Sequence, residues 1–256
     1  YRGLVFNDAA LLTEFYNNHL PFELTGAQKR VIREIYSDMK SGKQMNRLVQ
    51  GDVGSGKTIV GFISMLIAIG GNAQAALMAP TEVLAEQHAA GVRRLLQGVT
   101  VPDEGSLFGD RPLRVELLTN RVSGNDRREV LAGLADGSVD LVIGTHALLG
   151  KGVEFKDLGL MIIDEEQRFG VAHKERLKEL RADVHVLTLT ATPIPRTLQL
   201  ALTGVRDMSL IATPPVDRLA VRTFVMPYDP VIVREALIRE HVRGGQSFYV
   251  CPRIED

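Results

Sequence analysis

A glycine-rich octapeptide constrains the fold of this chain more than any other stretch of its sequence. The octapeptide, Gly51 to Thr58, follows a short apolar run at Leu48-Val49 and precedes a strongly apolar segment from Ile59 to Ile69. Glycines let the backbone turn sharply, so that its N–H groups can converge on one point without a Cβ in the way. The pattern therefore predicts a strand, a tight anion-binding loop and a buried helix, in that order.

The residue types inside this loop also have a chemical meaning. The octapeptide matches the pattern G-x-x-x-x-G-K-[ST] of a phosphate-binding loop. We expect Lys57 to place its charge beside the β- and γ-phosphates of a nucleotide, and the Thr58 hydroxyl to bind Mg²⁺. The alternative is a chance match in an ordinary turn, although three glycines within six residues would be costly there. The predicted nucleotide-binding residues of the loop are Gly51, Asp52, Val53, Gly54, Ser55, Gly56, Lys57 and Thr58.

From Met45 onwards, short apolar runs alternate with amphipathic segments such as 82–96 and 125–135. Such alternation predicts an α/β fold, in which a mostly parallel sheet is covered by helices on both faces. Ligands of these sheets bind beyond the carboxyl ends of the strands, so residues that follow the apolar runs are candidates for a site. The expected strands are 47–49, 75–78, 115–118, 141–143, 160–163 and 186–189.

An acidic motif follows the apolar run at 158–163, where the sequence continues as Asp164, Glu165, Glu166 and Gln167. In a nucleotide-hydrolysing site we expect Asp164 to hold Mg²⁺ and Glu165 to orient the attacking water. The alternative is a solvated acidic turn after a buried strand. The phosphate loop earlier in the chain favours the catalytic interpretation.

Three more groups of polar residues follow apolar runs. Thr190, Ala191 and Thr192 could hydrogen-bond the acidic motif and relay the state of the γ-phosphate, or form an ordinary strand-end turn. Thr81 and Thr145 could bind a DNA phosphate beside a helix N-terminus, or cap a helix, and the two roles are compatible. The candidate DNA-binding residues are Pro80, Thr81, Glu82, Gly144, Thr145 and His146.

An adenine-binding element is expected just before the sheet. The amide of Gln28, close to Leu24 and Thr25, could bind an adenine edge, and Phe22 could stack on the ring. The alternative for Gln28 is a surface position on a helix.

In this order the motifs resemble those of the first motor lobe of superfamily 2 helicases. The adenine-reading motif is matched by Leu24, Thr25 and Gln28, and the nucleotide-binding motifs by 51–58 and 164–167. The DNA-contacting motifs are matched by 79–82 and 144–146, and the coupling motif by 190–192. The resemblance implies a RecA-like lobe that hydrolyses ATP with Mg²⁺ and drives movement along DNA. It implies catalytic roles for Lys57, Asp164, Glu165 and Gln167, the last standing where many relatives have His.

Two branches of that superfamily have sequence motifs that are similar to segments of this chain. Residues 45–58 and 76–88 resemble RecG branch-migration helicases, and residues 157–224 resemble Mfd transcription-repair coupling translocases. Both a divergent member and a hybrid of the two branches fit this pattern. The resemblance implies a role in DNA repair or recombination, double-stranded or branched DNA as partner and, for an Mfd-like role, RNA polymerase.

The resemblance also suggests a domain division. Residues 1–211 are expected to form the ATP-binding lobe, 212–220 a proline-containing linker, and 221–256 the truncated beginning of a second lobe. A first residue other than Met fits a fragment or processed chain. The second lobe supplies an arginine finger in this superfamily, so we expect slow hydrolysis by this chain alone. Helices are expected near 8–20 and from Thr25, a surface loop at 97–112, and then a strand, a helix and a strand at 221–225, 230–242 and 247–250.

Composition excludes little. Thirty basic and 31 acidic residues give a net charge of −1, which neither predicts nor excludes nucleic acid as a partner. The single cysteine, Cys251, excludes an intramolecular disulfide and fits a reducing cytoplasm, and no apolar run is long enough for a membrane span. We expect a cytoplasmic monomer. The rival interpretations are another P-loop enzyme, such as a small-molecule kinase, and a nucleotide-binding interaction module without turnover of its own.

Overall fold

The computed structural model describes residues 2–52, 55–103, 105–107, 109–179, 183–195, 206–211 and 223–250. Contacts within the chain divide it into two compact units, Tyr1–Val216 and Asp217–Asp256. The predicted linker at 212–220 lies outside the described residues. All the candidate site residues belong to the first unit.

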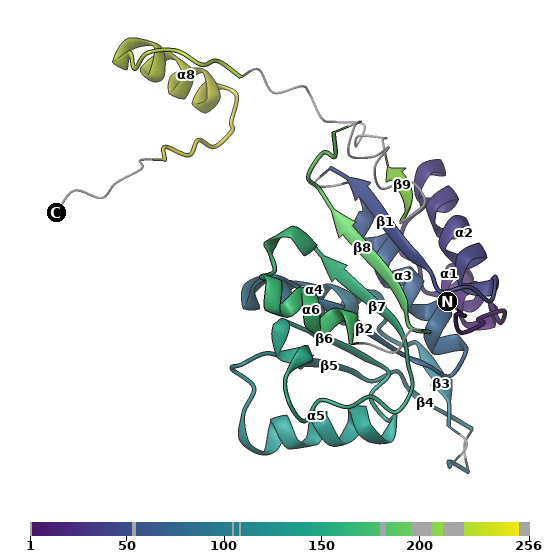
Figure 1. Cartoon of the computed structure of the whole chain (residues 1–256). Coiled ribbons are helices and arrows are strands. Elements are labelled where there is room, and N and C mark those ends of the chain that lie inside the picture. Colours follow the sequence, from purple (N-terminus) through teal and green to yellow (C-terminus); the bar gives the residue numbers. More distant parts are fainter. Residues whose placement is uncertain are drawn as a thin grey trace. The chain divides into compact units, whose positions relative to one another are not determined.

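The first unit is built on a sheet of seven parallel strands in the order β5-β6-β2-β7-β8-β1-β9 (Figure 1). All six expected strands are present, and the predicted α/β fold is confirmed. The edge strand β9 was not predicted, because its sequence, DMSLI, mixes polar and apolar residues without a continuous apolar run. The strands are β1 (Asn46–Gly51), β2 (Gln74–Met78), β5 (Val115–Leu118), β6 (Leu141–Gly144), β7 (Leu158–Asp164), β8 (His185–Thr190) and β9 (Asp207–Ile211).

Each face of the sheet has its own hydrophobic core. Along β7, Leu160 and Ile162 belong to one core, whereas Met161 and Ile163 belong to the other. This follows from the period of two in a strand, and it explains why β7 is apolar throughout. Helices α1 (Ala10–Asn18), α2 (Gly26–Lys40), α3 (Lys57–Gly70) and α4 (Glu82–Leu95) contribute to the first core, and α5 (Gly124–Asp136), the 3-10 helix η1 (His146–Leu149) and α6 (Val171–Lys178) pack on the second.

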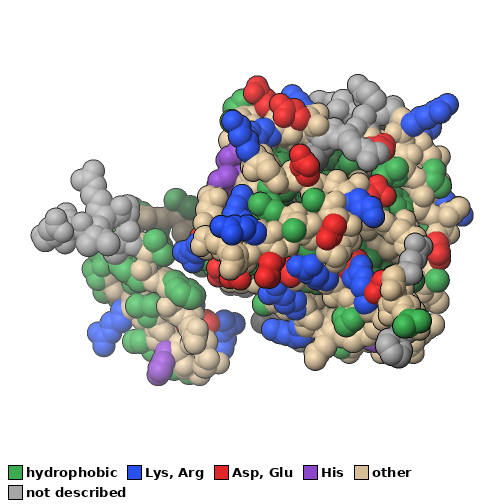
Figure 2. All heavy atoms as spheres, turned by 90° about the horizontal axis from the view of Figure 1, so that it is seen from below, with side chains coloured by type: hydrophobic (Ala, Val, Ile, Leu, Met, Phe, Trp, Pro, Cys, Tyr) green, Lys and Arg blue, Asp and Glu red, His purple; other side chains and the backbone are tan. Residues whose placement is uncertain are grey.

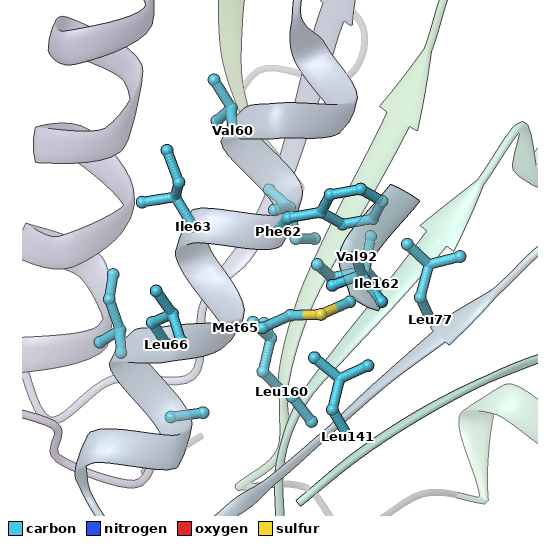
Figure 3. Close-up of a cluster of buried hydrophobic side chains, with 14 of the residues drawn as sticks. Val60, Phe62, Ile63, Met65, Leu66, Leu77, Val92, Leu141, Leu160 and Ile162 are labelled. Carbon is cyan, nitrogen blue, oxygen red and sulfur yellow. The ribbon is translucent and has the colours of Figure 1, made fainter. Parts of the chain in front are cut away.

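Helix α3, which follows the phosphate loop, is buried along almost its whole length. Phe62 and Met65 point from α3 toward the sheet, while Ile63 lies on the opposite side of the helix (Figure 3). Gly61 lets α3 lie close to the sheet, because a Cβ there would be 3.0 Å from Leu189 Cδ1. No helix among the described residues is both long enough and apolar enough to cross a membrane.

The expected surface loop at 97–112 is wrong in part, because it contains a short antiparallel hairpin. Its strands are β3 (Thr100–Pro102) and β4 (Asp110–Pro112). The Arg111 guanidinium donates two hydrogen bonds of 2.7 Å to the Asp140 carboxylate and so ties the hairpin to the start of β6. Strands of three residues with prolines lack a periodic pattern, which is why the sequence did not indicate the hairpin.

The second unit contains one described helix, α8 (Pro230–Val242), with the bounds expected from the sequence. The Asp229 carboxylate caps it by accepting a hydrogen bond of 2.9 Å from Val231 N. The expected strands are wrong where they are described, since 223–225 and 247–250 have no strand conformation. A strand needs a neighbouring strand to pair with, and no described strand pairs with either segment.

Candidate functional site

The candidate nucleotide-binding and catalytic residues gather at one edge of the sheet. Gly51, Asp164 and Thr190 end the strands β1, β7 and β8, which are neighbours in the order β7-β8-β1. Because these strands are parallel, their carboxyl ends lie at the same edge. The segment 190–192 therefore follows the strand that separates the phosphate loop from the acidic motif.

The phosphate loop leads directly into α3. Ser55 N donates to Asp52 O at 2.9 Å, and Lys57 and Thr58 form the first turn of the helix. The Ser55 hydroxyl is buried and has no hydrogen-bond partner among the described atoms. An unpartnered buried hydroxyl is costly, and phosphate oxygens would supply the missing acceptor. Val53 and Gly54, also expected to bind nucleotide, lie outside the described residues.

Gln28 joins the start of α2 to the phosphate loop. Its backbone N–H donates to Thr25 Oγ1 at 3.2 Å, and its side-chain Oε1 accepts from Thr25 N at 2.9 Å, which completes a capping box. Its Nε2 donates to Ser55 O at 3.1 Å. The amide is thus engaged by protein groups on both sides, with one Nε2 hydrogen left for a nucleotide. Leu24 is buried beside it, and Phe22 is exposed.

The acidic motif and the segment after β8 form one hydrogen-bonded network. Glu165 Oε2 accepts from the Thr190 hydroxyl at 3.0 Å, and Oε1 accepts from Ala191 N at 2.7 Å. Gln167 Nε2 donates to Glu165 and, at 3.2 Å, to Thr192 Oγ1. The network therefore joins two residues of the acidic motif, Glu165 and Gln167, to the whole segment 190–192. Asp164 is not part of it.

The backbone at Glu165 is unusual for a residue with a side chain. Its φ of 51° and ψ of 59° lie in the left-handed region. Such a conformation costs about 1–3 kcal/mol and persists only where surrounding contacts hold it, often at functional sites. The hydrogen bonds to Thr190 and Ala191 are such contacts.

Asp164 has a partner that the sequence analysis missed. His88, on α4, places its Nε2 2.9 Å from Asp164 Oδ2. His88 is the last residue of the segment 76–88 that resembles RecG helicases, and it lies on a helix seven positions after the candidate residue Thr81. No local pattern relates it to a residue at the end of β7.

Glu166 has a structural partner that was also missed. The Arg206 guanidinium, just before β9, donates two hydrogen bonds to the Glu166 carboxylate at 2.8 and 3.0 Å. This bidentate pair ties the 3-10 helix η2 (Glu166–Arg168) to the edge strand. It leaves Glu165 as the glutamate of the motif that faces the 190–192 segment.

The candidate DNA-binding residues follow β2 and β6 at the same edge of the sheet. Thr81 caps α4 by accepting from Leu84 N at 3.2 Å. Thr145 is buried and caps η1, accepting from Ala147 N at 3.3 Å, whereas His146 is exposed and stacks on His173 with ring centroids 4.5 Å apart. Gly144 is required by space, since an added Cβ would lie 2.1 Å from Leu118 O.

Charge around these residues is mixed. Glu82 pairs with Arg121 through a contact of 2.6 Å. Arg121 also lies 3.8 Å from Glu86. On the face of the molecule seen from below in Figure 2, which is not assigned to these residues, acidic and basic side chains are interspersed.

Comparison with known proteins supports a helicase assignment. The family model for DEAD/DEAH box helicases matches residues 25–201. The transcription-repair-coupling factor of Escherichia coli (strain K12) is 45% identical over 254 residues, which cover 99% of this chain and 21% of that protein. The one from Myxococcus xanthus is 49% identical over 234 residues, covering 91% and 18%. The chain thus spans about a fifth of the length of these relatives.

Solved structures agree with the family model. The structure of RecG bound to a three-way DNA junction superposes with a TM-score of 0.75 at 38% identity, covering 95% of this chain and 31% of that one. The helicase domain of Hef from Pyrococcus furiosus has a TM-score of 0.53 at 21% identity, covering 85% and 45%, which shows a shared fold alone. The observed sheet, the phosphate loop and the matched family model agree, and this chain belongs to the DEAD/DEAH box helicase family.

Proposed function

We propose that this chain is the ATP-binding motor lobe of a double-stranded DNA translocase that acts in DNA repair or recombination. The observation that carries the proposal is the network joining Glu165 to Thr190, Ala191 and, through Gln167, to Thr192. It connects a carboxylate suited to orient water with a segment that can respond to the γ-phosphate.

ATP would bind at the phosphate loop. Lys57 and Thr58 stand at the N-terminus of α3, where backbone N–H groups and the helix dipole favour phosphate. Gln28 is hydrogen-bonded to the loop and exposed Phe22 is available to an adenine ring. Catalytic roles for Lys57, Asp164, Glu165 and Gln167 follow from the same proposal.

Mg²⁺ would be held by the Thr58 hydroxyl and the Asp164 carboxylate together with phosphate oxygens and water. Both protein donors are hard oxygen ligands, which Mg²⁺ prefers. The described residues contain no group of three or more His, Cys, Asp or Glu side chains that could hold a metal without a nucleotide. Mg²⁺ commonly binds through one or two protein ligands plus substrate phosphates, so the donor set fits.

DNA would lie along the ends of β2 and β6, against Pro80, Thr81, Glu82 and the 144–146 segment. The helix N-terminus at Thr81 and exposed His146 support this placement. The RecG relative is bound to a three-way junction and two curated relatives are transcription-repair-coupling factors. We therefore propose duplex or branched DNA as the partner, RNA polymerase as a partner in an Mfd-like role, and residues 221–256 as the start of a second lobe.

ATP hydrolysis with and without duplex DNA tests the proposal, with binding of a fluorescent ATP analogue measured in parallel. Lys57→Ala should weaken binding, and Glu165→Gln should abolish hydrolysis while binding persists. DNA-stimulated hydrolysis that Glu165→Gln removes is the result expected for a working motor.

The other outcomes separate the alternatives. Nucleotide binding without stimulated hydrolysis would favour a lobe that needs a second lobe for turnover, since an arginine finger contributes about 10³–10⁵ in rate. Absence of nucleotide binding by the unmodified chain would overturn the proposal. Transfer of phosphate to a small molecule would favour a kinase.

A further inference from the structure

His88 contacts both the acidic motif, through Asp164, and the helix that follows the phosphate loop, through Phe62 of α3. It was not itself among the candidate site residues. It is on the second turn of α4, with its side chain 14% exposed, and its Nε2 is 2.9 Å from Asp164 Oδ2. An ionised carboxylate can only accept hydrogen bonds, so Nε2 carries the hydrogen in this contact. The imidazole therefore fixes the rotation of the Asp164 carboxylate through Oδ2, and no described residue donates a hydrogen bond to Oδ1.

The imidazole is itself held in place by α3. Phe62 packs against the His88 ring edge to face, with ring centroids 6.1 Å apart and an interplanar angle of 88°. Phe62 lies one turn after Thr58 on the same helix, and it points to the side of α3 where Val92 of α4 lies (Figure 3). Gly91 of α4 lies beside the same ring, where an added Cβ would be in ordinary contact with Phe62 Cε2 at 3.6 Å.

The backbone of α4 is fixed just as firmly. Ala85 and Ala89, which flank His88 along the helix, are fully or almost fully buried in the core on this face of the sheet. A ring anchored to a buried helix and packed against an aromatic neighbour has few other positions to occupy. The contact with Asp164 is therefore a built feature of the fold and not a chance meeting of mobile surface side chains.

We propose that His88 is a positioning residue that orients the Asp164 carboxylate for the nucleotide-bound divalent cation. The inference rests on the proposed function, because it takes Asp164 as a cation ligand. Groups that hydrogen-bond a metal ligand set its orientation, and their loss typically costs about 10- to 100-fold in metal affinity or activity. Because α4 begins at the candidate DNA-binding segment 80–82, the same residue links that segment to the cation site.

Cation affinity tests the proposal without relying on turnover. Mn²⁺, which electron paramagnetic resonance detects, replaces Mg²⁺, and its binding to the complete chain is measured in the presence of ADP. His88→Leu keeps an apolar contact for Phe62 but has no donor, and we expect it to weaken Mn²⁺ binding about 10- to 100-fold. His88→Gln offers an amide N–H and should restore most of the affinity. Gln87→Ala, an exposed change on the same helix, is the control and should bind as the unmodified chain does.

Nucleotide binding in EDTA separates a cation effect from a general loss of the site. It should be the same in the unmodified chain, His88→Leu and His88→Gln. The positioning role would be overturned if the Leu and Gln variants had equal Mn²⁺ affinity. It would also be overturned if nucleotide binding in EDTA fell in parallel with Mn²⁺ binding. If the unmodified chain bound neither nucleotide nor Mn²⁺ with nucleotide, the proposed function would fail, and this inference with it. Thermal unfolding of the Leu and Gln variants establishes that both are folded when they are compared.

Discussion

The Thr190 hydroxyl donates a hydrogen bond of 3.0 Å to Glu165 Oε2, across the boundary between two neighbouring strands. Glu165 follows β7 and Thr190 ends β8, so the contact exists only when the two strands pair in the observed register. The same carboxylate accepts from Ala191 N, which adds a backbone donor to the side-chain donor. The geometry makes the orientation of Glu165 depend on the segment that follows β8.

Thr190→Val removes this donor while keeping the shape of the side chain. A hydrogen bond to a charged group contributes about 1.5–3 kcal/mol, which corresponds to roughly a 10- to 100-fold change in rate. We expect kcat for ATP to fall by that factor while KM changes little, because the proposed nucleotide-binding groups lie on the phosphate loop and at the start of α2. Steady-state kinetics measures both constants, and an unchanged kcat would contradict a coupling role for Thr190.

Gly56→Ala should disable the phosphate loop. Gly56 has a φ of 80°, and a Cβ there would lie 1.9 Å from Gln28 Nε2, so the change would strain the backbone and displace Gln28. A left-handed backbone costs a residue with a side chain roughly 1–2 kcal/mol before any collision. Binding of a fluorescent ATP analogue should be lost or strongly weakened. Gly170→Ala is the matched control, since nothing lies within 4 Å of its added Cβ, and normal binding is expected there.

His185 should make the first unit less stable in acid. Desolvation by burial lowers the pKa of this imidazole below 6.5, against the smaller opposing effect of its hydrogen bond to Leu4 O. The ring is neutral in the folded chain, with Nδ1 accepting from Met45 N at 2.8 Å and Nε2 donating to Leu4 O at 2.6 Å. The unfolded chain takes up a proton first, so this stability is complete above pH 6.5 and is lost as pH falls toward the lowered pKa.

Urea unfolding at pH 7.5 and 5.5 measures this effect, with His185→Gln as the variant that cannot be protonated. The unmodified chain should lose more stability between the two pH values than the variant does. Equal losses would show that other groups cause the acid sensitivity.

Leu66→Ala should destabilise the first unit by about 2–5 kcal/mol, the usual cost of removing a buried leucine side chain. Leu66 is fully buried on α3, the helix that follows the phosphate loop, and belongs to the first core. Val83→Ala, at a half-exposed position of α4, should change stability by no more than about 0.5 kcal/mol. Urea denaturation of both variants measures the difference, and similar midpoints would argue against the described packing of α3.

Features that depend on residues close together in the chain were predictable from the sequence. The strands, the buried helix after the phosphate loop and the acidic turn after β7 follow from apolar periodicity and from glycine spacing over a few residues. Helix α8 had the expected bounds because Asp229 and Pro230 form a local start signal. The helicase family followed from the order of these local motifs.

Tertiary structure alone decided which of these parts touch. The pairing of His88 with Asp164 spans 76 positions, and the pairing of Glu166 with Arg206 spans 40. The strand β9 likewise pairs with the distant strand β1, and the β3–β4 hairpin is joined to the distant Asp140 through Arg111. No described strand pairs with the segments 223–225 and 247–250, where strands were expected. The physical reason is that periodicity and turn chemistry act over a few residues, whereas a side-chain hydrogen bond forms only where the packing of the sheet brings donor and acceptor within about 3 Å.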